Sequence, residues 1–489
     1  MCYFGTDGIR GTYGQFPMTE EGAHRLGLAV AGYLKERGGR SLLLGRDTRF
    51  SGKNLAEALV RGLGKHLSVG DLGILPTPAL AMAVASLRAD LGVMITASHN
   101  PATDNGFKLL GPEAQKLPDA ELAEIEKRLD ERGTPSPEEL LASKDADAPE
   151  SNQKSPKAEL ADVERRLDES EAPFPEKPLV SEDAEASGPN LKNVSFADQY
   201  IAWLRGHWPG RLPLKRLLID AAHGATSNFV PKVFASPEAD ILCIAREPDG
   251  HNINAGVGSE HVGFLAKQVL ASGADLGIAF DGDGDRCVVC DADGEPVPGD
   301  QLLGIFALDL ERRGKLAHHR CVATVMSNTG LDHSLRRRGI ELLRSDVGDA
   351  QVWSRMLALG ARFGGEASGH IIFRDLAPGG DGMLTAILLL SLLARTGRPL
   401  RELREEIPLF PQETCSLPVA ANPPLATLAG FQEGCRQLEK NMGCVGRVFV
   451  RYSGTEPRIR LLVEAAENDA VEATMAALKK WVAKHLELV

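Results

Sequence analysis

The sequence predicts an α/β protein with more than one domain. Short apolar runs typical of buried strands alternate with longer segments whose apolar residues recur at helical spacing. Several of the strand-like runs end in loops rich in glycine and aspartate, the place where α/β enzymes hold their reacting groups. The chain has 489 residues, more than one hydrophobic core usually supports, so several domains are expected.

The first predicted domain, 1–195, contains a regular alternation of helices and strands. Its predicted elements are helix 20–37, strand 41–45, helix 55–63, strand 91–95 and helix 119–132. From 133 to 193 the chain becomes rich in Pro, Ser, Glu, Asp and Lys, which predicts an insertion or linker with little core of its own. Within it, residues 158–169 repeat the helix sequence 120–131 with three conservative differences. One duplicated helix is too little for a solenoid.

Three further domains are predicted at 196–298, 299–407 and 408–489. Their predicted elements are strands 217–220, 274–280 and 287–290 in the second; helix 301–313, strand 321–326, helix 330–338, strand 341–344 and a helix from 350 in the third; and strands 446–451 and 459–464 with helix 468–486 in the fourth. The second and third domains alternate strands and helices, which predicts α/β units. The fourth is smaller and predicted to be α+β.

Composition excludes several classes of protein. The net charge of −12 argues against a nucleic-acid binder, so an anionic substrate must meet a local basic cluster. The longest apolar run, 386–394, is too short to span a membrane, and the N-terminal residues do not resemble a signal peptide. Cys287 and Cys290 form a CxxC in a Val-rich strand, where they face opposite sides. The eight cysteines are therefore expected to be free thiols of a cytoplasmic protein.

Ser98 lies in the loop 96–101, Thr-Ala-Ser-His-Asn-Pro, directly after the predicted strand 91–95. A serine hydroxyl exposed at the end of a strand can accept a group and pass it on. The alternative is that Ser98 only caps the turn with its side chain, and on this stretch alone that alternative is favoured. No Gly-x-Ser-x-Gly elbow surrounds Ser98, which argues against a Ser-His-Asp triad.

The segment 281–286, Asp-Gly-Asp-Gly-Asp-Arg, predicts a metal site. Three carboxylates this close repel one another unless a cation joins them, and hard oxygen ligands suit Mg²⁺ or Ca²⁺. A calcium EF-hand is excluded, because its sixth position needs glycine and its twelfth needs glutamate, whereas this chain has Arg286 and Ala292. The alternative is an acidic turn facing solvent.

Two further loops have weaker signals. Residues 451–460 combine arginines, two hydroxyls and a glycine, the donors that phosphate oxygens need, although a hairpin turn with surface arginines is an equal alternative. In the loop 365–370, Gly-Glu-Ala-Ser-Gly-His, Glu366 could accept hydrogen bonds from sugar hydroxyls. The Gly-rich N-terminal loop 4–11 offers Arg10 as an anion ligand.

Taken together and in this order, five motifs resemble the α-D-phosphohexomutases. They are Phe-Gly-Thr-Asp-Gly-Ile-Arg-Gly, Thr-Ala-Ser-His-Asn-Pro, Asp-Gly-Asp-Gly-Asp-Arg, Gly-Glu-x-Ser-Gly-His and Arg-x-Ser-Gly-Thr-Glu-Pro. The opening and closing motifs look most like the phosphoglucosamine mutase branch. The resemblance covers nearly the whole chain except 133–193. It implies four domains around a central cleft, three of them related α/β units and the fourth smaller.

The resemblance also implies a role for each motif. It implies that Ser98 is phosphorylated and that one Mg²⁺ is held by the Ser98 phosphate with Asp281, Asp283 and Asp285. The residues implied to surround the transferring phosphoryl group are Arg10, Lys108, Arg286 and His370. Those implied to contact sugar hydroxyls are Glu366 and Ser368, and those implied to grip the non-reacting phosphate are Arg451, Ser453, Gly454, Thr455 and Arg460.

The implied activity is the interconversion of glucosamine 6-phosphate and glucosamine 1-phosphate, through the phosphoserine and glucosamine 1,6-bisphosphate. A phosphosugar is the expected partner, with no nucleic acid or membrane, and a homodimer is possible. Relatives often carry Lys-Val-Gly-Asp-Arg where this chain has Asp346-Val347-Gly348-Asp349-Ala350, and Pro378-Gly379 replaces a usual Thr-Thr. The two missing basic residues leave two alternatives: a phosphomannomutase/phosphoglucomutase, or a sugar-phosphate-binding protein that has lost turnover.

Overall fold

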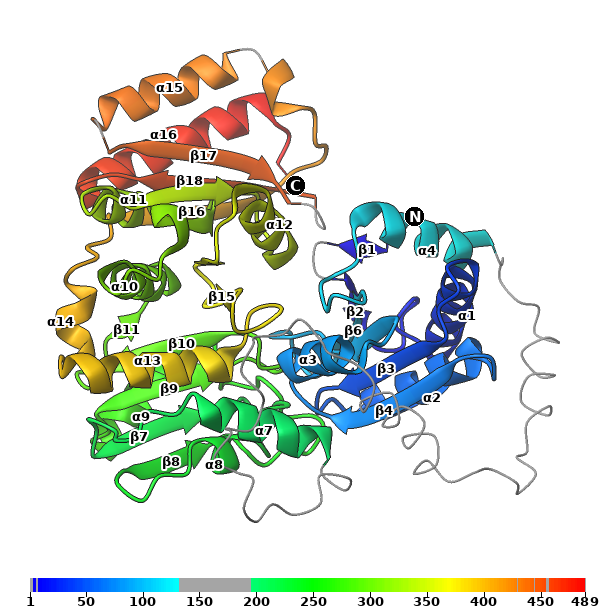
Figure 1. Cartoon of the computed structure of the whole chain (residues 1–489). Coiled ribbons are helices and arrows are strands. Elements are labelled where there is room, and N and C mark those ends of the chain that lie inside the picture. The colour runs from blue at the N-terminus through cyan, green and yellow to red at the C-terminus, as the bar shows by residue number, and fades with distance from the viewer. Residues whose placement is uncertain are drawn as a thin grey trace.

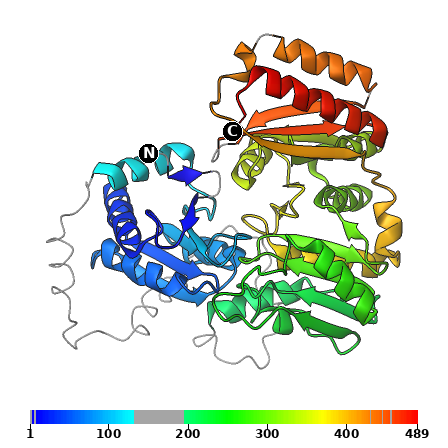
Figure 2. The ribbon, with the colours of Figure 1, turned by 180° about the vertical axis from the view of Figure 1, so that it is seen from behind.

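The computed structural model describes residues 3–5, 8–131, 195–428, 430–443, 445–453 and 457–488. The predicted insertion 133–193 with the helix copy at 158–169, and the predicted phosphate ligands Gly454 and Thr455, lie outside these ranges. The described chain forms four sheets with their helices, arranged around the middle of the molecule (Figures 1 and 2). None of the described helices has the length and apolar character needed to cross a membrane.

The first unit contains a six-stranded sheet in the order β1-β2-β6-β5-β3-β4. Its elements are β1 (Phe4–Gly5), β2 (Gly8–Thr12), α1 (Glu20–Glu36), β3 (Ser41–Arg46), α2 (Gly52–Leu63), β4 (Ser68–Ile74), α3 (Thr77–Leu87), β5 (Leu91–Ile95), β6 (Asp104–Leu110) and α4 (Asp119–Glu131). Side chains alternate across each strand, so Leu42 and Leu44 of β3 pack with α1 and α2, whereas Leu43 packs with α3 on the other face.

The second unit has a five-stranded sheet and the third a four-stranded sheet. The second contains α7 (Phe196–Gly206), β7 (Arg216–Asp220), α8 (Val230–Val233), β8 (Asp240–Ile244), α9 (Val262–Ser272), β9 (Leu276–Phe280), β10 (Cys287–Asp291) and β11 (Pro296–Val297). The third contains α10 (Gly299–Arg312), η4 (Ala317–His319), β12 (Arg320–Thr324), α11 (Thr329–Arg336), β13 (Glu341–Ser345), α12 (Asp349–Leu359), β14 (Phe363–Gly365), β15 (Ile371–Phe373), α13 (Gly382–Thr396) and α14 (Leu400–Arg404).

All three sheets share one core arrangement. A first strand pairs in parallel with the second and third strands on its two sides, and a fourth joins the third antiparallel: β4-β3-β5-β6, β8-β7-β9-β10 and β13-β12-β14-β15. This repeated order confirms the predicted set of three related α/β units. The CxxC prediction also holds, since Cys287 and Cys290 of β10 pack into different apolar clusters on opposite faces.

The fourth unit is a three-stranded antiparallel sheet, β16-β18-β17, with its own apolar core. Its elements are β16 (Gln412–Pro418), η5 (Leu425–Thr427), α15 (Phe431–Asn441), β17 (Arg447–Tyr452), β18 (Arg458–Glu464) and α16 (Asn468–His485). The first three units, in contrast, contribute to one continuous apolar cluster. Helix α13 follows the third sheet in sequence but packs on β9 and β10 of the second (Figure 1), which ties these two units together.

Backbone hydrogen bonds join the loops at the strand ends. Thr77 N donates to Asp283 O at 2.9 Å, joining the first unit to the second. Gly382 N donates to Gly284 O, and Cys287 N to Gly369 O, each at 3.0 Å, joining the second unit to the third. These main-chain contacts fix the loop 281–286 to the starts of α3 and α13, and the loop 365–370 to the first residue of β10.

Candidate active site

Ser98 lies at the end of the fully buried strand β5, as predicted. Its φ of 52° is in the left-handed region, which non-glycine residues rarely adopt and which often marks a functional position. The expectation of an exposed hydroxyl was wrong: the residue is only 1% exposed, because the loop 281–286 of the second unit lies against it. Its amide donates to Thr96 Oγ1 at 2.8 Å, and its hydroxyl donates to Asp281 Oδ2 at 2.5 Å. The turn-capping alternative does not account for this second contact, which reaches another unit.

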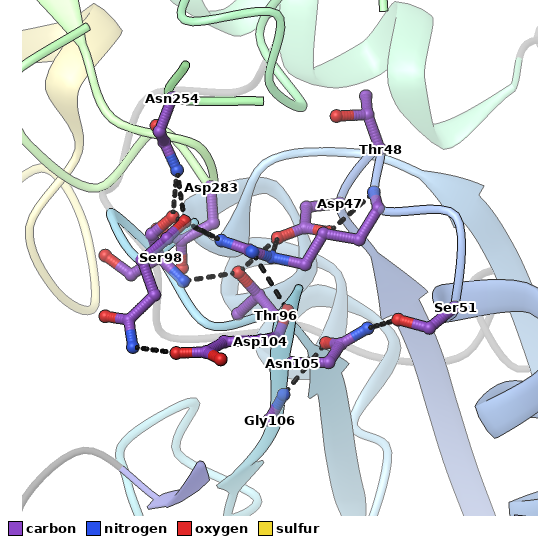
Figure 3. A network of polar contacts seen from close by, with 12 residues as sticks. Asp47, Thr48, Ser51, Thr96, Ser98, Asp104, Asn105, Gly106, Asn254 and Asp283 are labelled. Atoms are coloured by element: carbon purple, nitrogen blue, oxygen red, sulfur yellow. Dashed lines mark hydrogen bonds and ion pairs between the residues drawn. The ribbon is translucent and has the colours of Figure 1, made fainter. Parts of the chain in front are cut away.

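A buried ion pair between Asp47 and Arg49 holds the Ser98 loop in place. Figure 3 shows Asp47, Thr96 and Ser98 within this network of polar contacts. Arg49 Nε lies 3.0 Å from Asp47 Oδ2, and both side chains are fully buried. The rest of the guanidinium donates to main-chain carbonyls of the loop, at Ser98 (2.9 Å), Asn100 (2.8 Å), Pro101 and Asp104 (2.9 Å). The planar guanidinium of Arg49 thus fixes the backbone of this loop at several carbonyl groups between Ser98 and Asp104.

The second unit closes over this loop. Asn254 Nδ2 donates to Ser98 O at 2.8 Å and to Asn100 O at 3.0 Å, and Figure 3 shows it approaching from the side opposite Asp104. Gly282 packs so closely that a Cβ there would meet Ser98 O at 2.5 Å. A glycine is therefore required at this position of the 281–286 loop for the two loops to touch.

The three carboxylates of that loop converge directly after β9. Ligand atoms of Asp281, Asp283 and Asp285 all lie within 4.8 Å of one another. Lys108 Nζ donates to Asp283 Oδ2 at 2.8 Å and to Asp285 Oδ2 at 3.0 Å. The buried Oδ1 atoms of Asp283 and Asp285 have no hydrogen-bond partner among the described residues. Three buried carboxylates with unused oxygens fit a hard divalent cation such as Mg²⁺.

Burial would raise the pKa of every carboxylate in the triad, but Lys108 at Asp283, and Lys108 with His370 at Asp285, outweigh it and lower the pKa of these two. Burial, and then the charges of Asp285 and Asp283, raise the pKa of Asp281 well above its usual range. Burial alone would lower the pKa of Lys108, but the carboxylates of Asp283 and Asp285 outweigh it and raise that pKa. Lys108 therefore stays charged and offsets part of the negative charge. Thr77, the first residue of α3, adds a hydrogen bond of 2.6 Å to Asp283 Oδ2.

The other residues that were predicted to surround the phosphoryl group are Arg10, Arg286 and His370, and they lie near the carboxylate triad and the Ser98 loop. Arg10 lies on β2 rather than in the predicted loop, and its guanidinium donates to Asn100 Oδ1 of the Ser98 loop at 3.4 Å. Arg286 donates through its amide to Asp281 Oδ1 at 3.1 Å, while its guanidinium pairs with Glu260 at 3.2 Å. His370 Nδ1 lies 3.7 Å from Asp285 Oδ1. Burial would lower the pKa of His370, but the Asp285 carboxylate outweighs it and raises that pKa. Burial, and then the charge of Arg286, lower the pKa of His99 to about 4, so His99 is neutral near pH 7.

Glu366 and Ser368 lie with His370 in the loop between β14 and β15. Glu366 Oε1 accepts a hydrogen bond from Gly348 N at 3.0 Å. Ser368 Oγ is buried without a hydrogen-bond partner among the described residues, which suits a hydroxyl that meets a ligand. Gly369 has a φ of 87°, and a Cβ there would meet Cys287 O at 2.4 Å. The loop is thus packed directly on the strand that follows the carboxylates.

Of the predicted phosphate ligands of the fourth unit, Arg451 lies on β17, Ser453 follows the end of β17, and Arg460 lies on β18. Arg451 and Arg460 are directly opposite each other in the register, an arrangement that destabilises a sheet unless an anion or solvent separates the charges. Burial, and then the charge of Arg460, lower the pKa of Arg451. Arg458 instead donates to Ser416, through Nε to Oγ and Nη2 to O, each at 2.8 Å. Ser453 N closes the hairpin on Arg458 O.

Several residues of the site were not predicted from the sequence. Asp47 and Arg49 follow the predicted strand 41–45, and their position at a strand end was the only available signal. Thr77 and Asn254 had no sequence signal, because their contacts reach loops about 150 to 200 positions away in the chain.

Models of four phosphoglucomutase/phosphomannomutase domains match this chain. They are the alpha/beta/alpha domains I (1–135), II (210–294) and III (298–410) and the C-terminal domain (415–480). A phosphoglucosamine mutase of Maricaulis maris is 40% identical over 475 residues, which are 95% of either chain. The chain belongs to the α-D-phosphohexomutase family. A phosphoglucosamine mutase of Paenarthrobacter aurescens is 39% identical over 490 residues, covering 99% of this phosphohexomutase and 97% of the relative.

Solved structures share the fold of this phosphohexomutase. A phosphoglucomutase/phosphomannomutase family protein from Burkholderia thailandensis has a TM-score of 0.74 at 24% identity, covering 99% of this chain and 97% of that one. The N-acetylphosphoglucosamine mutase of Aspergillus fumigatus, in complex with GlcNAc-6P and magnesium, has a TM-score of 0.63 at 18% identity, covering 99% and 95%.

Replacing Arg49 with methionine should destabilise the phosphohexomutase by about 3–5 kcal/mol, because it leaves the buried Asp47 charge unpaired. Urea unfolding measures this loss. Arg46→Met is the matched control, since Arg46 pairs with the half-exposed Asp71 at 3.0 Å and such a pair contributes only about 0–1 kcal/mol. Equal losses from the two substitutions would contradict the role given to the Asp47–Arg49 pair.

Proposed function

We propose that this phosphohexomutase is an isomerase that interconverts glucosamine 6-phosphate and glucosamine 1-phosphate through a phosphorylated Ser98. The observation that carries the proposal is the contact of Ser98 Oγ with Asp281, 2.5 Å away. It places a strained serine hydroxyl against a carboxylate triad suited to a divalent cation. The choice of the amino sugar is supported by the phosphoglucosamine mutases to which the chain is 36–40% identical over nearly its full length.

The reaction requires two phosphoryl transfers. In the first, the bond between phosphorus and Ser98 Oγ breaks as phosphorus bonds to the oxygen of the free sugar hydroxyl. That hydroxyl loses its proton, and Ser98 Oγ gains one. This step forms glucosamine 1,6-bisphosphate. After the bisphosphate turns over, Ser98 Oγ takes the phosphoryl group from the other end, and the sugar oxygen there recovers a proton. Ser98 is phosphorylated again, so the net change is isomerisation.

We propose that Asp281, Asp283, Asp285 and the Ser98 phosphate hold one Mg²⁺. When bound, the ion would neutralise negative charge on the transferring phosphoryl group. Lys108, Arg10, Arg286 and His370 supply further positive charge around this group, at fixed positions that need no rearrangement during the reaction. Positioning and electrostatics are the main contributions that an enzyme makes to phosphoryl transfer.

The remaining predicted residues recognise the sugar and its second phosphate in this proposal. Glu366 and Ser368 contact sugar hydroxyls. Arg451, Ser453 and Arg460, together with Gly454 and Thr455 outside the described residues, grip the phosphate that is not transferred. The opposed pair Arg451–Arg460 supports this role, because a phosphate dianion between two guanidinium groups would relieve their repulsion.

We further propose the domain boundaries 1–195, 196–298, 299–407 and 408–489, with 133–193 as an insertion. Each of the four described sheets lies within one of these ranges. A cytoplasmic location is supported by the free cysteines among the described residues, since disulfides are rare in that compartment. A homodimer stays a prediction.

The proposal is tested by measuring turnover of the purified protein with glucosamine, glucose and mannose phosphates. We expect kcat/KM to be highest for the amino sugar. Intact mass should show a phosphorylated fraction that Ser98→Ala lacks, and the variant should have no mutase activity above background.

Preference for glucose or mannose phosphates would favour the phosphomannomutase/phosphoglucomutase alternative. The observation behind that alternative is that Asp346 and Ala350 stand where relatives often carry basic residues. Binding of all three sugars without turnover would favour the non-catalytic alternative. Near-full activity of Ser98→Ala would exclude the phosphoserine mechanism.

Asp283→Asn should weaken Mg²⁺ binding and lower activity by orders of magnitude, because a neutral amide replaces a charged ligand. Calorimetric titration with Mg²⁺ measures the binding directly. Asp293→Asn is the control, because Asp293 is an exposed residue on the turn after β10 that pairs with Arg401. If both variants bind Mg²⁺ as the wild type does, the carboxylate triad is not the metal site.

Arg451→Ala should raise KM strongly for any phosphosugar substrate. Loss of a hydrogen bond to a charged group costs about 1.5–3 kcal/mol, or roughly 10- to 150-fold in KM. Arg458→Ala is the control in the same hairpin, because Arg458 is hydrogen-bonded to Ser416 and the substitution leaves Arg451 and Arg460 in place. We expect it to change KM little. An unaltered KM in Arg451→Ala would mean that this hairpin does not hold the phosphate.

A further inference from the structure

We propose that Lys116 is a positioning residue of this reaction, which holds Asp349 and, through it, the ring of His370. The inference rests on the proposed function, because it concerns His370, which that proposal places beside the transferring phosphoryl group. Neither Lys116 nor its contact with Asp349 was predicted from the sequence.

Lys116 lies in a turn that folds back on β6, the strand of Lys108. Gly111 N donates to Gln115 O at 2.7 Å, and Leu117 N donates to Leu109 O at 3.2 Å. Between these contacts, Leu110 and Lys116 form an antiparallel bridge. The backbone of Lys116 is thus fixed to the same strand that places Lys108 against the carboxylate triad.

Two consecutive residues of this turn cross to the third unit. Lys116 Nζ donates to Asp349 Oδ1 at 2.5 Å, and the two side chains are 13% and 20% exposed. Gln115 Nε2 donates to Pro378 O in the segment before α13. In both ribbon views α12, which begins at Asp349, faces the first unit (Figures 1 and 2).

Asp349 in turn faces the catalytic histidine. Its Oδ2 lies 3.9 Å from His370 Nε2, while His370 Nδ1 lies 3.7 Å from Asp285 Oδ1. The imidazole therefore lies between two carboxylates at ion-pair distance, one in the loop 281–286 and one at the start of α12. His370 is also confined by Gly380, where a Cβ would meet its ring at 2.3 Å.

The local charges explain why a lysine is needed. The segment 346–350 contains two aspartates and no basic residue. Burial raises the pKa of Asp349, but Lys116 and then His370 outweigh it and lower that pKa to about 2. Without Lys116, the carboxylate would have to find other partners, and the side chain that backs His370 would lose its fixed position. A shift of about 1 Å in a reacting group can cost on the order of 100-fold in rate.

The test compares Lys116→Met, Lys116→Arg and Gln115→Ala with the wild-type enzyme, using whichever phosphosugar the wild type turns over. For Lys116→Met we expect kcat to fall by about 10- to 100-fold, with KM within about 3-fold. The melting temperature should also fall, because the largely buried Asp349 loses its partner, so kcat is measured at a temperature where the variant is fully folded. Lys116→Arg should recover most of the loss, because it keeps the charge. Gln115→Ala, which breaks the neighbouring bridge between the same units, should stay close to wild type.

A double-mutant cycle then isolates the pathway through Asp349. Asp349→Asn should lower kcat as Lys116→Met does, and the double variant should be no worse than either single one. Additive losses would overturn the proposal, and so would a wild-type kcat in Lys116→Met or no rescue by arginine. Equal losses in Gln115→Ala would show that closure of the two units matters rather than Lys116. A wild-type enzyme that prefers another sugar would refute the proposed substrate but leave this inference intact.

Discussion

The buried ion pair of Asp47 and Arg49 is the interaction on which the site depends. A left-handed serine at the end of a strand is strained, so other contacts must hold the loop. Arg49 supplies them by donating to carbonyls along the loop from Ser98 to Asp104. Thr96 adds to the same network by donating to Asp47 Oδ2 at 2.6 Å. Moving Arg49 away from Asp47 would leave a buried charge unpaired, which is costly in free energy. Arg49 therefore stays in place, and its hydrogen bonds keep the backbone of the loop in the strained conformation.

The second constraint is the balance of charge around the triad. A chain with a net charge of −12 must gather cations locally to bind a phosphosugar. The structure brings Lys108 from the first unit and His370 from the third to carboxylates of the second, and it places Arg10 beside the Ser98 loop. Each cation lies on a different element, so no single loop could reproduce the site. The metal proposed at the triad would complete this balance.

The arrangement of units explains how such a site stays rigid. The first three units contribute to one apolar cluster, and α13 is anchored through Asp381, which accepts hydrogen bonds from Leu384 N at its own helix start and from Tyr200 of the second unit. The fourth unit has a separate core. The proposed phosphate-binding residues thus lie on a unit with its own core, and this separation suits the proposed reaction, whose intermediate must turn over between two transfers.

Much of this could be predicted from the sequence, because some of its patterns are local. Short continuous apolar runs predicted β3 and β5. The spacing of Asp281, Asp283 and Asp285 predicted their convergence, since glycines between them let the backbone fold within six residues. The elements that were not predicted include strands β1, β2, β4, β8 and β16 and helices α3, α9 and α15. Strands β4 and β8 are edge strands with mixed burial, and α15 has no buried residue. Tertiary structure alone decided which distant groups meet. Asn254 on Ser98, Thr77 on Asp283 and Lys116 on Asp349 are contacts between separate units, and no local pattern encodes a contact whose partner lies more than a hundred residues away.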